Sequence, residues 1–572
     1  MTKVADCIAR YLNACGVEVM FSQSLPSALV LAAEDTGIRQ VTYRTENAAG
    51  AMADAYARTS GKIGVVCAQN GPAAALLVAP LAEALKVSVP VIALVQEVPR
   101  NQTDKNAFQE LDHIALFASC TKWARVVNDP NRIGDYLRQA ITAATSGRPG
   151  PVALMLPADV LLEDIDDEDI AELHGLGSWP LDRAIANPRL IERAAVALSA
   201  AELPLIIAGG GVHSSGAENV LAKLQDEYGI PVGTTMMGKG SVDDRHSLSV
   251  GLVGNVMGSK SVGKHLKTMV AAADVVLLVG SRTNQNGTDS WSLYPKSAKK
   301  IHIDVDGNEV GRNYPALRLI GDARLTLEAL IKAMKNQDAA KRKSTRAGFE
   351  KTIADGRTHH GKETRSALES DASPILPERV LSEVEKLLEP DSIVVADASY
   401  SSVWINAHLS SKRPGMRFIT PRGLAGLGWG FPMALGSKLA NPKSAVVCFA
   451  GDGGFGHVWS ELETAVRENI PVVMIVLNNG TLGYQKDAEH VKFGRHTGAC
   501  YFNPVDHAAI AKACGCDAHS ISDPSDLASV LEEAIKSNKP TLIDVITDPN
   551  SYPPLTMFEG SLENARRAKE AA

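Results

Sequence analysis

The chain has 572 residues, of which 45% are hydrophobic and 22% are charged, so it is too long for one core and ordinary for a soluble globular protein. A net charge of -7 gives no electrostatic case for binding nucleic acid or an anionic membrane. No apolar run reaches about 18 residues, and the N-terminus lacks the pattern of a signal peptide. Its eight cysteines are scattered without a CxxC pair, which favours reduced thiols in a cytoplasmic protein.

Residues 1–170 alternate short apolar runs with helical patterns, which predicts a parallel, doubly wound α/β domain. The expected strands are Gly16–Phe21, Gln40–Arg44, Ile63–Ala68, Val89–Val95 and Pro151–Leu156. The acidic run 163–169 is interpreted as a solvated linker because it is a block of like charge.

Residues 185–350 repeat the alternation and predict a middle α/β domain with strands at Leu205–Ala208, Val275–Val279 and Ile301–Val305. Gly209 to Gly211 resemble half of a dinucleotide fingerprint, but without the full spacing a strand-to-helix turn is the better interpretation. The polar stretch 339–373 is expected to be a helix and connector in which His359 and His360 are exposed.

Residues 375–548 form a third region of the same kind, and its most informative part runs from Val446 to Gly483. We expect a strand, a glycine turn, an amphipathic helix and a second strand parallel to the first. Asp452 and Asn479 would then lie at carboxyl ends of strands, where they suit a hard cation such as Mg²⁺. Gly453 and Gly454 would let the backbone approach a phosphate, although two ordinary tight turns would look similar.

The tail 549–572 is expected to be either a lid or a packed terminus. The sequence therefore predicts three doubly wound parallel-sheet domains followed by this tail.

The GDG motif that begins at Gly451, followed after a fixed gap by Asn478 and Asn479, resembles the thiamine diphosphate (ThDP) fingerprint. In that family the matching aspartate, second asparagine and a main-chain carbonyl bind Mg²⁺. The resemblance implies that Asp452, Asn479 and Thr481 are the metal ligands here.

Glu46 follows a predicted strand and precedes a helix rich in alanine. Taken alone, it could be a charge at a helix N-terminus. The segments RTENAA at 44–49 and ADAYAR at 53–58 resemble the family segment that places a carboxylic acid against the ThDP pyrimidine ring. The chain is therefore identified as a member of the acetolactate synthase, pyruvate oxidase and benzoylformate decarboxylase superfamily.

This resemblance implies that 1–170 binds the pyrimidine, that 375–548 binds the diphosphate, and that Glu46 is catalytic. It implies a homodimer or homotetramer with active sites between subunits. The other implied cofactor-binding residues are Ser399, Tyr400, Ser401, Ala425, Gly426, Leu427, Gly453, Gly454, Leu482 and Gly483. Gln109 is implied to contact the reacting groups, and the implied substrate pocket contains Ser24, Leu25, Phe108, Gln109 and Tyr484.

The implied reaction is decarboxylation or carboligation of a 2-keto acid, in which the ylid attacks a carbonyl and an acceptor traps the enamine. Because several pocket positions depart from acetolactate synthases, a carbon–carbon lyase or decarboxylase acting on an aldehyde or acyl-CoA remains an alternative. A non-catalytic ThDP-fold protein is a further alternative. Thr283, Asn284 and Gln285 replace the usual flavin contacts, so FAD, ADP or an empty pocket are all open in the middle domain.

Overall fold

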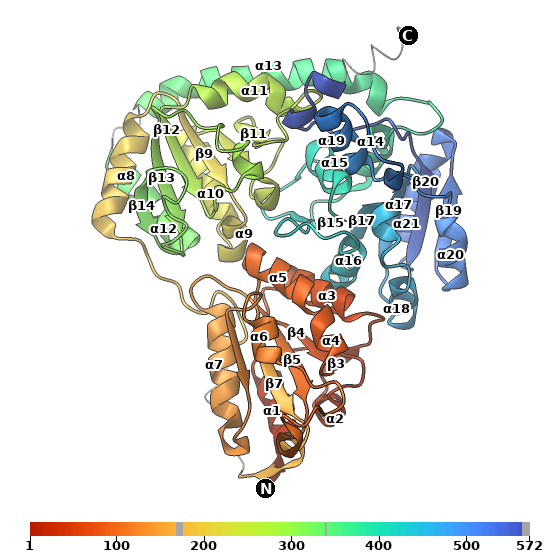
Figure 1. The fold of residues 1–572 in the computed structure, drawn as a ribbon. Helices are drawn as coiled ribbons and strands as arrows, with labels where there is room; N and C mark the ends of the chain where they lie inside the picture. The colour runs from red at the N-terminus through yellow and green to blue at the C-terminus, as the bar shows by residue number, and fades with distance from the viewer. Residues whose placement is uncertain (167–175, 338–339, 563–572) are drawn as a thin grey trace.

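The computed structural model describes residues 1–166, 176–337 and 340–562. It contains three six-stranded parallel sheets, each flanked by helices, and confirms the predicted doubly wound α/β architecture (Figure 1). A small antiparallel pair, β1 (Thr2–Lys3) and β8 (Asp164–Ile165), closes the N-terminal domain. Two residues of the acidic run are therefore strand rather than linker, and 167–169 of that run lie outside the described residues.

The N-terminal sheet has the order β3-β2-β4-β5-β7-β6. Its strands are β2 (Val19–Phe21), β3 (Arg39–Val41), β4 (Gly64–Ala68), β5 (Val91–Glu97), β6 (Trp123–Val126) and β7 (Val152–Pro157). The main helices are α1 (Val4–Ala14), α2 (Ser27–Asp35), α3 (Glu46–Ser60), α4 (Pro72–Leu76), α5 (Val78–Val87) and α7 (Ile133–Thr145). Strand β6 was not predicted, because it is a short edge strand with an exposed Arg125 and no continuous apolar run.

The middle sheet has the order β11-β10-β9-β12-β13-β14, so its first strand lies beside its fourth. Its strands are β9 (Pro204–Ala208), β10 (Val232–Thr234), β11 (Ser249–Leu252), β12 (Val275–Val279), β13 (Lys299–Asp304) and β14 (Leu317–Ile320). Helices α8 (Pro188–Ala200), α9 (Gly211–Ser215), α10 (Glu218–Tyr228), α11 (Val262–Ala271) and α12 (Ala323–Met334) cover it. The three buried strands β9, β12 and β13 were predicted, whereas the shorter outer strands were not.

The C-terminal sheet has the order β16-β15-β17-β18-β20-β19, which repeats the order of the N-terminal sheet. Its strands are β15 (Ile393–Ala396), β16 (Arg417–Ile419), β17 (Val446–Gly451), β18 (Val473–Asn478), β19 (Asp517–Ile521) and β20 (Thr541–Ile546). Its helices include α14 (Pro377–Leu387), α15 (Tyr400–His408), α16 (Gly430–Ala440), α17 (Asp452–Phe455), α18 (Glu461–Arg467), α19 (Gly483–Phe493), α20 (His507–Ala513) and α21 (Leu527–Lys536).

The N-terminal and C-terminal domains pack together through α3 and α16 (Figure 1). Small residues permit this contact: a Cβ on Gly436 would lie 2.1 Å from the carbonyl oxygen of Met52. On the other face of α3, a Cβ on Gly64 would lie 2.3 Å from the carbonyl oxygen of Ala53. The alanine-rich sequence of α3 is thus explained by close packing against backbone on two sides.

The connector helix α13 (Ala340–Leu368) runs along the outside of the molecule and contacts α11 and α14 (Figure 1). His359 is exposed as predicted, whereas His360 is half-buried, because the helix packs on α11 rather than standing free. The described part of the tail is packed: Tyr552, Leu555 and Phe558 are buried against the C-terminal domain. The rest of the tail, 563–572, lies outside the described residues.

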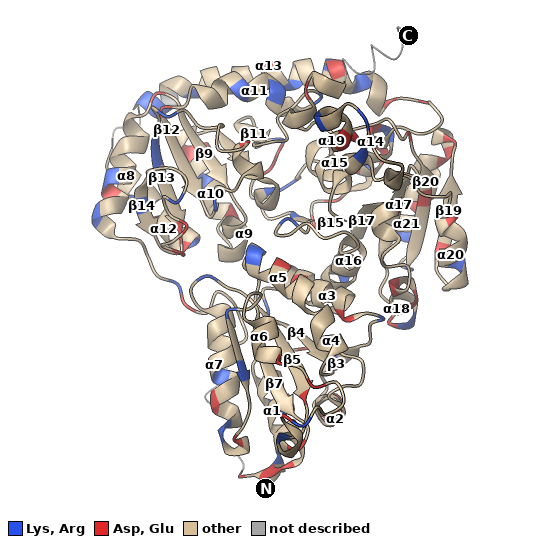
Figure 2. Cartoon of the chain, viewed as in Figure 1, with Lys and Arg blue, Asp and Glu red and all other residues tan. Residues whose placement is uncertain are grey.

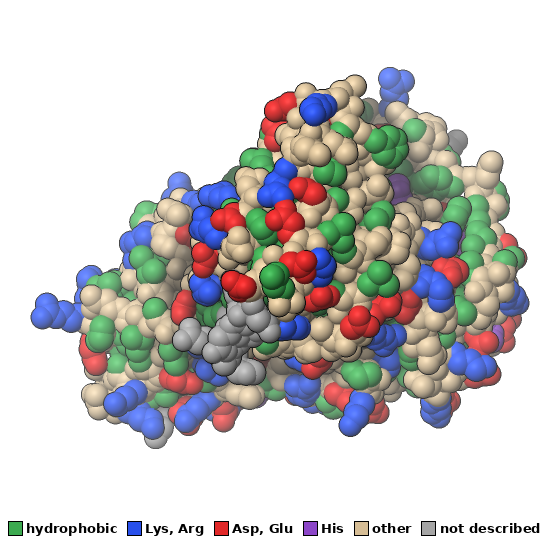
Figure 3. Space-filling model, turned by 90° about the horizontal axis from the view of Figure 1, so that it is seen from below, with side chains coloured by type: hydrophobic (Ala, Val, Ile, Leu, Met, Phe, Trp, Pro, Cys, Tyr) green, Lys and Arg blue, Asp and Glu red, His purple; other side chains and the backbone are tan. Residues whose placement is uncertain are grey.

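Charges of both signs are mixed over the three domains (Figure 2), and the face seen from below shows apolar side chains scattered among them (Figure 3). All eight cysteines are free thiols, and seven of them are buried. Within the described parts of the chain, every helix is too short or too polar to cross a membrane.

We predict that Gly436→Ala lowers the free energy of unfolding by about 1–3 kcal/mol, because the added methyl group collides with the α3 backbone. Chemical denaturation measures this change. Gly348→Ala is the matched control, since nothing lies within 4 Å of a Cβ at this position in α13. The control should be neutral or stabilising by up to about 1 kcal/mol, and equal effects of the two variants would contradict the packing argument.

Candidate functional site

A cavity of about 60 Å³ lies in the C-terminal domain, where strands β15, β17 and β18 end. Strand β15 has β16 on one side and β17 on the other, so the strand order reverses between β15 and β17. Doubly wound sheets bind ligands at such a switch point. Of the predicted site residues, those that line the cavity are Ser399, Tyr400, Ser401, Leu427, Gly453, Gly454, Asn479, Thr481, Leu482 and Gly483. These residues come from four separate segments that the sheet brings together.

The three predicted metal ligands, Asp452, Asn479 and Thr481, contact one another in sequence at this edge. The backbone N–H of Asn479 donates to Asp452 Oδ1 over 3.3 Å, and both the N–H and the hydroxyl of Thr481 donate to Asn479 Oδ1 over 3.0 Å. Burial raises the pKa of Asp452 to about 6. Within the described residues, no three His, Cys, Asp or Glu side chains converge as a metal site. One carboxylate with an amide oxygen fits a hard cation that keeps waters and phosphate oxygens as its other ligands.

Helix N-termini also meet at the cavity. Helix α15 begins at Tyr400 and α19 begins at Gly483, and both residues line the cavity. The N–H groups of a first helical turn, together with the helix dipole, favour a negatively charged group at such an end. The glycine turn after β17 opens only the four-residue α17, so the predicted single crossover helix is in fact two pieces, α17 and α18.

The glycine-rich loop 421–430 is held over the cavity by a buried carboxylate. Asp397 accepts the N–H groups of Gly428 (2.9 Å), Trp429 (3.1 Å) and Gly430 (3.1 Å). Burial raises the pKa of Asp397, and these backbone donors oppose that effect. The backbone approaches so closely that a Cβ on Gly430 would lie 2.5 Å from the Asp397 nitrogen. The sequence did not single out Asp397. The only sign of its role was that an acidic residue comes directly after a buried strand.

The predicted cofactor residues Ala425 and Gly426 belong to this loop but do not line the cavity. Ala425 has a φ of 62°, a left-handed conformation that is unusual for a residue with a side chain. Gly426 packs on an indole ring, since a Cβ there would lie 2.6 Å from Trp429 Cη2. Leu427 is the loop residue among these three that reaches the cavity.

Glu46 is the first residue of α3, and it does not line the cavity of its own chain. The backbone just before it is held by the C-terminal domain: Glu461 accepts the N–H groups of Arg44 (3.2 Å) and Thr45 (3.1 Å). Trp429 Nε1 donates to Asn47 Oδ1 over 3.0 Å. The residues on both sides of Glu46 are therefore held at the contact between the two domains. Asp452 does not line the cavity either.

The predicted substrate residues of the N-terminal domain also lie apart from this cavity. Ser24 and Leu25 follow β2, and Phe108 and Gln109 lie against the turn that follows β4. Both strands end at the switch point of their own sheet. Phe108 is 83% exposed, whereas Tyr484, in the C-terminal domain, packs edge-on against Tyr400 with ring centroids 5.8 Å apart.

A histidine that the sequence did not reveal orders this N-terminal edge. The buried His113 accepts the N–H of Gly71 at Nε2 over 2.9 Å, and its Nδ1 lies 2.6 Å from Glu97 Oε2. Asn70, the neighbour of Gly71, donates to the carbonyl oxygens of Phe108 (3.3 Å) and Gln109 (3.0 Å). The Glu97–His113 pair therefore fixes the turn that carries the Phe108–Gln109 backbone.

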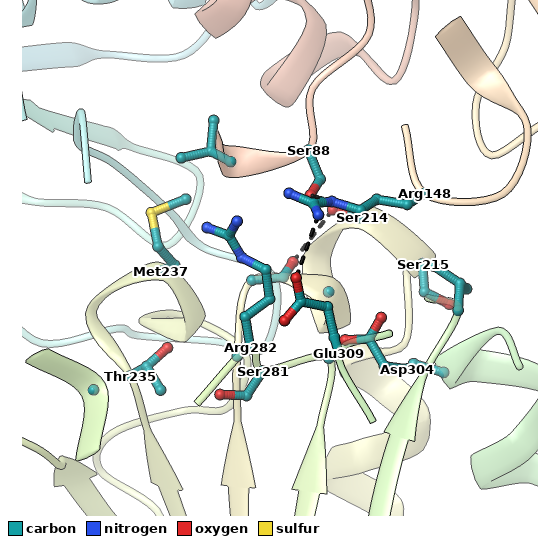
Figure 4. A pocket seen from close by; sticks show the side chains of 18 of the residues that line it. Ser88, Arg148, Ser214, Ser215, Thr235, Met237, Ser281, Arg282, Asp304 and Glu309 are labelled. Atoms are coloured by element: carbon teal, nitrogen blue, oxygen red, sulfur yellow. Dashed lines mark hydrogen bonds and ion pairs between the residues drawn. The ribbon is translucent and has the colours of Figure 1, made fainter. Parts of the chain in front are cut away.

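A second cavity, of about 140 Å³, lies at the switch point of the middle sheet, between the ends of β9 and β12 (Figure 4). Arg148 reaches it from the N-terminal domain and donates to Glu309 over 3.4 Å. Burial lowers the pKa of Arg282 and raises that of Asp304 to about 6. The predicted strand-to-helix turn at Gly209 is present, and a Cβ there would lie 2.3 Å from the carbonyl oxygen of Gly280.

The sequence matches three family descriptions that together span most of the chain. They are the thiamine pyrophosphate enzyme N-terminal TPP binding domain at residues 2–116, the central domain at 191–330 and the C-terminal TPP binding domain at 397–545. The chain is 34% identical to a probable acetolactate synthase large subunit of Methanocaldococcus jannaschii, covering 98% of this chain and 95% of that protein. A protein of the same name from Methanococcus aeolicus is 33% identical, over 96% and 92%. The isozyme 3 large subunit of Escherichia coli is 29% identical, over 96% of each.

We predict that Asp397→Asn lowers the free energy of unfolding by about 1–3 kcal/mol, because an amide NH₂ group would face backbone donors that need an acceptor. Chemical denaturation of the two proteins measures the difference. Asp391→Asn, at an exposed position just before β15, is the matched control and should leave stability unchanged. Wild-type stability of Asp397→Asn would show that the carboxylate does not hold the loop.

Proposed function

Because this chain belongs to the thiamine pyrophosphate enzyme family, we propose that it is an acetolactate synthase-like enzyme that decarboxylates and couples 2-keto acids. The observation that carries the proposal is the cavity at the C-terminal switch point, which gathers the expected diphosphate-binding segments. Bound ThDP would supply a carbon nucleophile and an electron sink, and the protein would supply orientation and proton control.

The residues at the cavity fit the diphosphate and its metal ion. Asp452 and Asn479 would hold Mg²⁺ through their side-chain oxygens, together with the carbonyl of Thr481. The N-termini of α15 and α19 would face the phosphate oxygens. Leu427 would contact the body of the cofactor, and the carbonyl of Ala425 would accept a hydrogen bond from its amino group.

Glu46 is proposed to exchange a proton with the pyrimidine ring. Glu46 does not line the cavity of its own chain, and the family resemblance implies that a second copy of the chain supplies it. The same holds for Gln109, Phe108, Ser24 and Leu25, which lie at the N-terminal switch point and would form the substrate pocket with Tyr484. The proposed assembly is a homodimer or homotetramer, in which each active site combines the N-terminal domain of one chain with the C-terminal domain of another.

The cavity of the middle domain is proposed to hold an adenosine diphosphate group, either free or as part of FAD. Asp304, the last residue of β13, lines this cavity, and its carboxylate would accept a hydrogen bond from a ribose hydroxyl. Arg148 and Arg282 supply positive charge for phosphates in the same cavity. Absorbance of the material released on denaturation would distinguish a flavin, an adenine nucleotide and an empty cavity.

A substrate panel tests the reaction. The protein is reconstituted with ThDP and Mg²⁺ and given pyruvate, benzoylformate, oxalyl-CoA or a 2-hydroxyacyl-CoA, and CO₂ and carbon products are followed. Acetolactate from pyruvate supports the proposal. Turnover of a CoA ester or an aldehyde product would favour a lyase or decarboxylase, and no cofactor-dependent turnover would favour a non-catalytic protein.

We expect Glu46→Gln to abolish turnover while leaving ThDP binding within a few-fold of wild type, because an amide cannot take up and release a proton as a carboxylic acid does. Steady-state assays and calorimetry measure the two properties. Glu18→Gln, an exposed position in the same domain, should leave both unchanged. An active Glu46→Gln protein would remove the proposed role.

The affinity for ThDP and Mg²⁺ should fall as the pH drops through the pKa of Asp452, which burial raises to about 6. Above that pH the carboxylate is ionised and can bind the cation, and below it the proton competes with the metal. We expect a loss of about tenfold per pH unit below the pKa, measured by calorimetry between about pH 7.5 and about pH 5. Asp452→Asn should bind more weakly and lose this dependence, and an unchanged pH profile would exclude Asp452 as the titrating ligand.

A further inference from the structure

Glu83, on α5 of the N-terminal domain, is buried against the glycine-rich loop of the C-terminal domain. Its side chain is 1% exposed. Oε1 accepts the N–H of Gly423 over 2.7 Å, and Oε2 accepts the N–H groups of Leu424 (2.5 Å) and Ala425 (3.3 Å). One carboxylate thus serves three consecutive backbone donors in another domain.

Together with Asp397, Glu83 fixes the loop from both sides. Asp397 binds the N–H groups of residues 428–430, and Glu83 binds those of residues 423–425. Gly426 and Leu427 are the two residues that lie between these anchored segments. Of the two proposed cofactor contacts, the Ala425 carbonyl belongs to the last residue of the first anchored segment. The Leu427 side chain belongs to the two-residue stretch between the anchored segments.

The conformation of the loop requires such support. Ala425 has a φ of 62° and Gly428 a φ of 84°, and a left-handed residue with a side chain costs about 1–3 kcal/mol unless its surroundings impose it. Gly423 allows the close approach, since a Cβ there would lie 2.9 Å from Glu83 Oε2. The three hydrogen bonds to the Glu83 carboxylate hold the backbone of residues 423–425 in this conformation.

One buried cation, Arg58, faces the carboxylate of Glu83. Arg58 Nη2 lies 3.7 Å from Glu83 Oε1, and Arg58 Nη1 donates to the carbonyl oxygen of Thr420 over 2.9 Å. Asp54 in turn holds Arg58 Nε at 2.6 Å. Arg422, in the loop, donates to Ser402 of α15, the helix that begins at the cavity, over 2.9 Å. Through Arg58, the Glu83 carboxylate is thus linked to the backbone at Thr420, directly before the loop.

We propose that Glu83 is a positioning residue of the active site: it holds segment 423–425 so that Ala425 and Leu427 are correctly placed for the cofactor. This inference rests on the proposed function. Glu83 does not line the cavity, so its effect reaches the cofactor through the loop alone.

The test compares Glu83→Gln with Glu468→Gln in the full-length protein loaded with ThDP and Mg²⁺. Glu468 is a matched control, because it also bridges the two domains, accepting the N–H of Thr42 over 3.1 Å, without touching the loop. We expect Glu83→Gln to lower kcat by about 10²-fold, with the Kd for ThDP and the KM within about threefold of wild type. Hydrogen exchange of the amides of residues 423–425 should accelerate in this variant and stay unchanged in Glu468→Gln.

Wild-type kcat and wild-type exchange in Glu83→Gln would overturn the proposal, as would equal losses of activity in the two variants. If Glu83→Gln does not fold, Glu83→Asp keeps the charge, withdraws the carboxylate by one methylene, and should show the same split between kcat and KM. Exchange and ThDP binding do not require turnover. A wild-type protein that binds ThDP but turns over no substrate would therefore refute the proposed reaction, and loop exchange alone would then decide the role of Glu83.

Discussion

The contact between the N-terminal and C-terminal domains depends on giving hydrogen-bond acceptors to the backbone N–H groups of one glycine-rich loop, which lies away from water. Residues 423–430 run between two domains, and an N–H left there without an acceptor would cost about 1–3 kcal/mol. Glu83 and Asp397 accept six of these groups, one carboxylate from each domain. The N–H groups of residues 423–425 therefore find their acceptor on the docked N-terminal domain. The close contact of α3 with α16, which small residues permit, provides that docking.

The dependence between the two domains is mutual. Glu461 of the C-terminal domain holds the backbone that leads into Glu46, just as Glu83 of the N-terminal domain holds the backbone around Ala425. Each domain thus fixes the elements that its neighbour contributes to the proposed chemistry. Within a single chain, Glu46 does not line the cavity that gathers Asn479 and the predicted diphosphate-binding segments.

All three sheets gather their candidate ligand residues at the edge where the strand order reverses, but the residues gathered there differ. The first and third sheets share one strand order and differ from the middle sheet, and each sheet brings its candidate ligand residues to a switch point. In the C-terminal domain that edge carries an acidic residue and helix N-termini. In the middle domain it carries Asp304, and arginines from all three domains line the cavity there. The N-terminal edge carries the turn that His113 and Glu97 hold.

The sequence by itself determined the α/β class, the long buried strands and the residues of the GDG and glutamate motifs, because hydrophobic periodicity and local turn chemistry are encoded over short stretches. It missed edge strands such as β6 and β14, whose pairing comes from a neighbouring strand rather than from their own composition. It also placed His360 on an exposed connector, whereas packing on α11 half-buries it. Only the tertiary structure showed the roles of Glu83, Asp397 and Glu461. Each is an ordinary acidic residue in the sequence, and its partners are backbone N–H groups that carry no residue-specific signal.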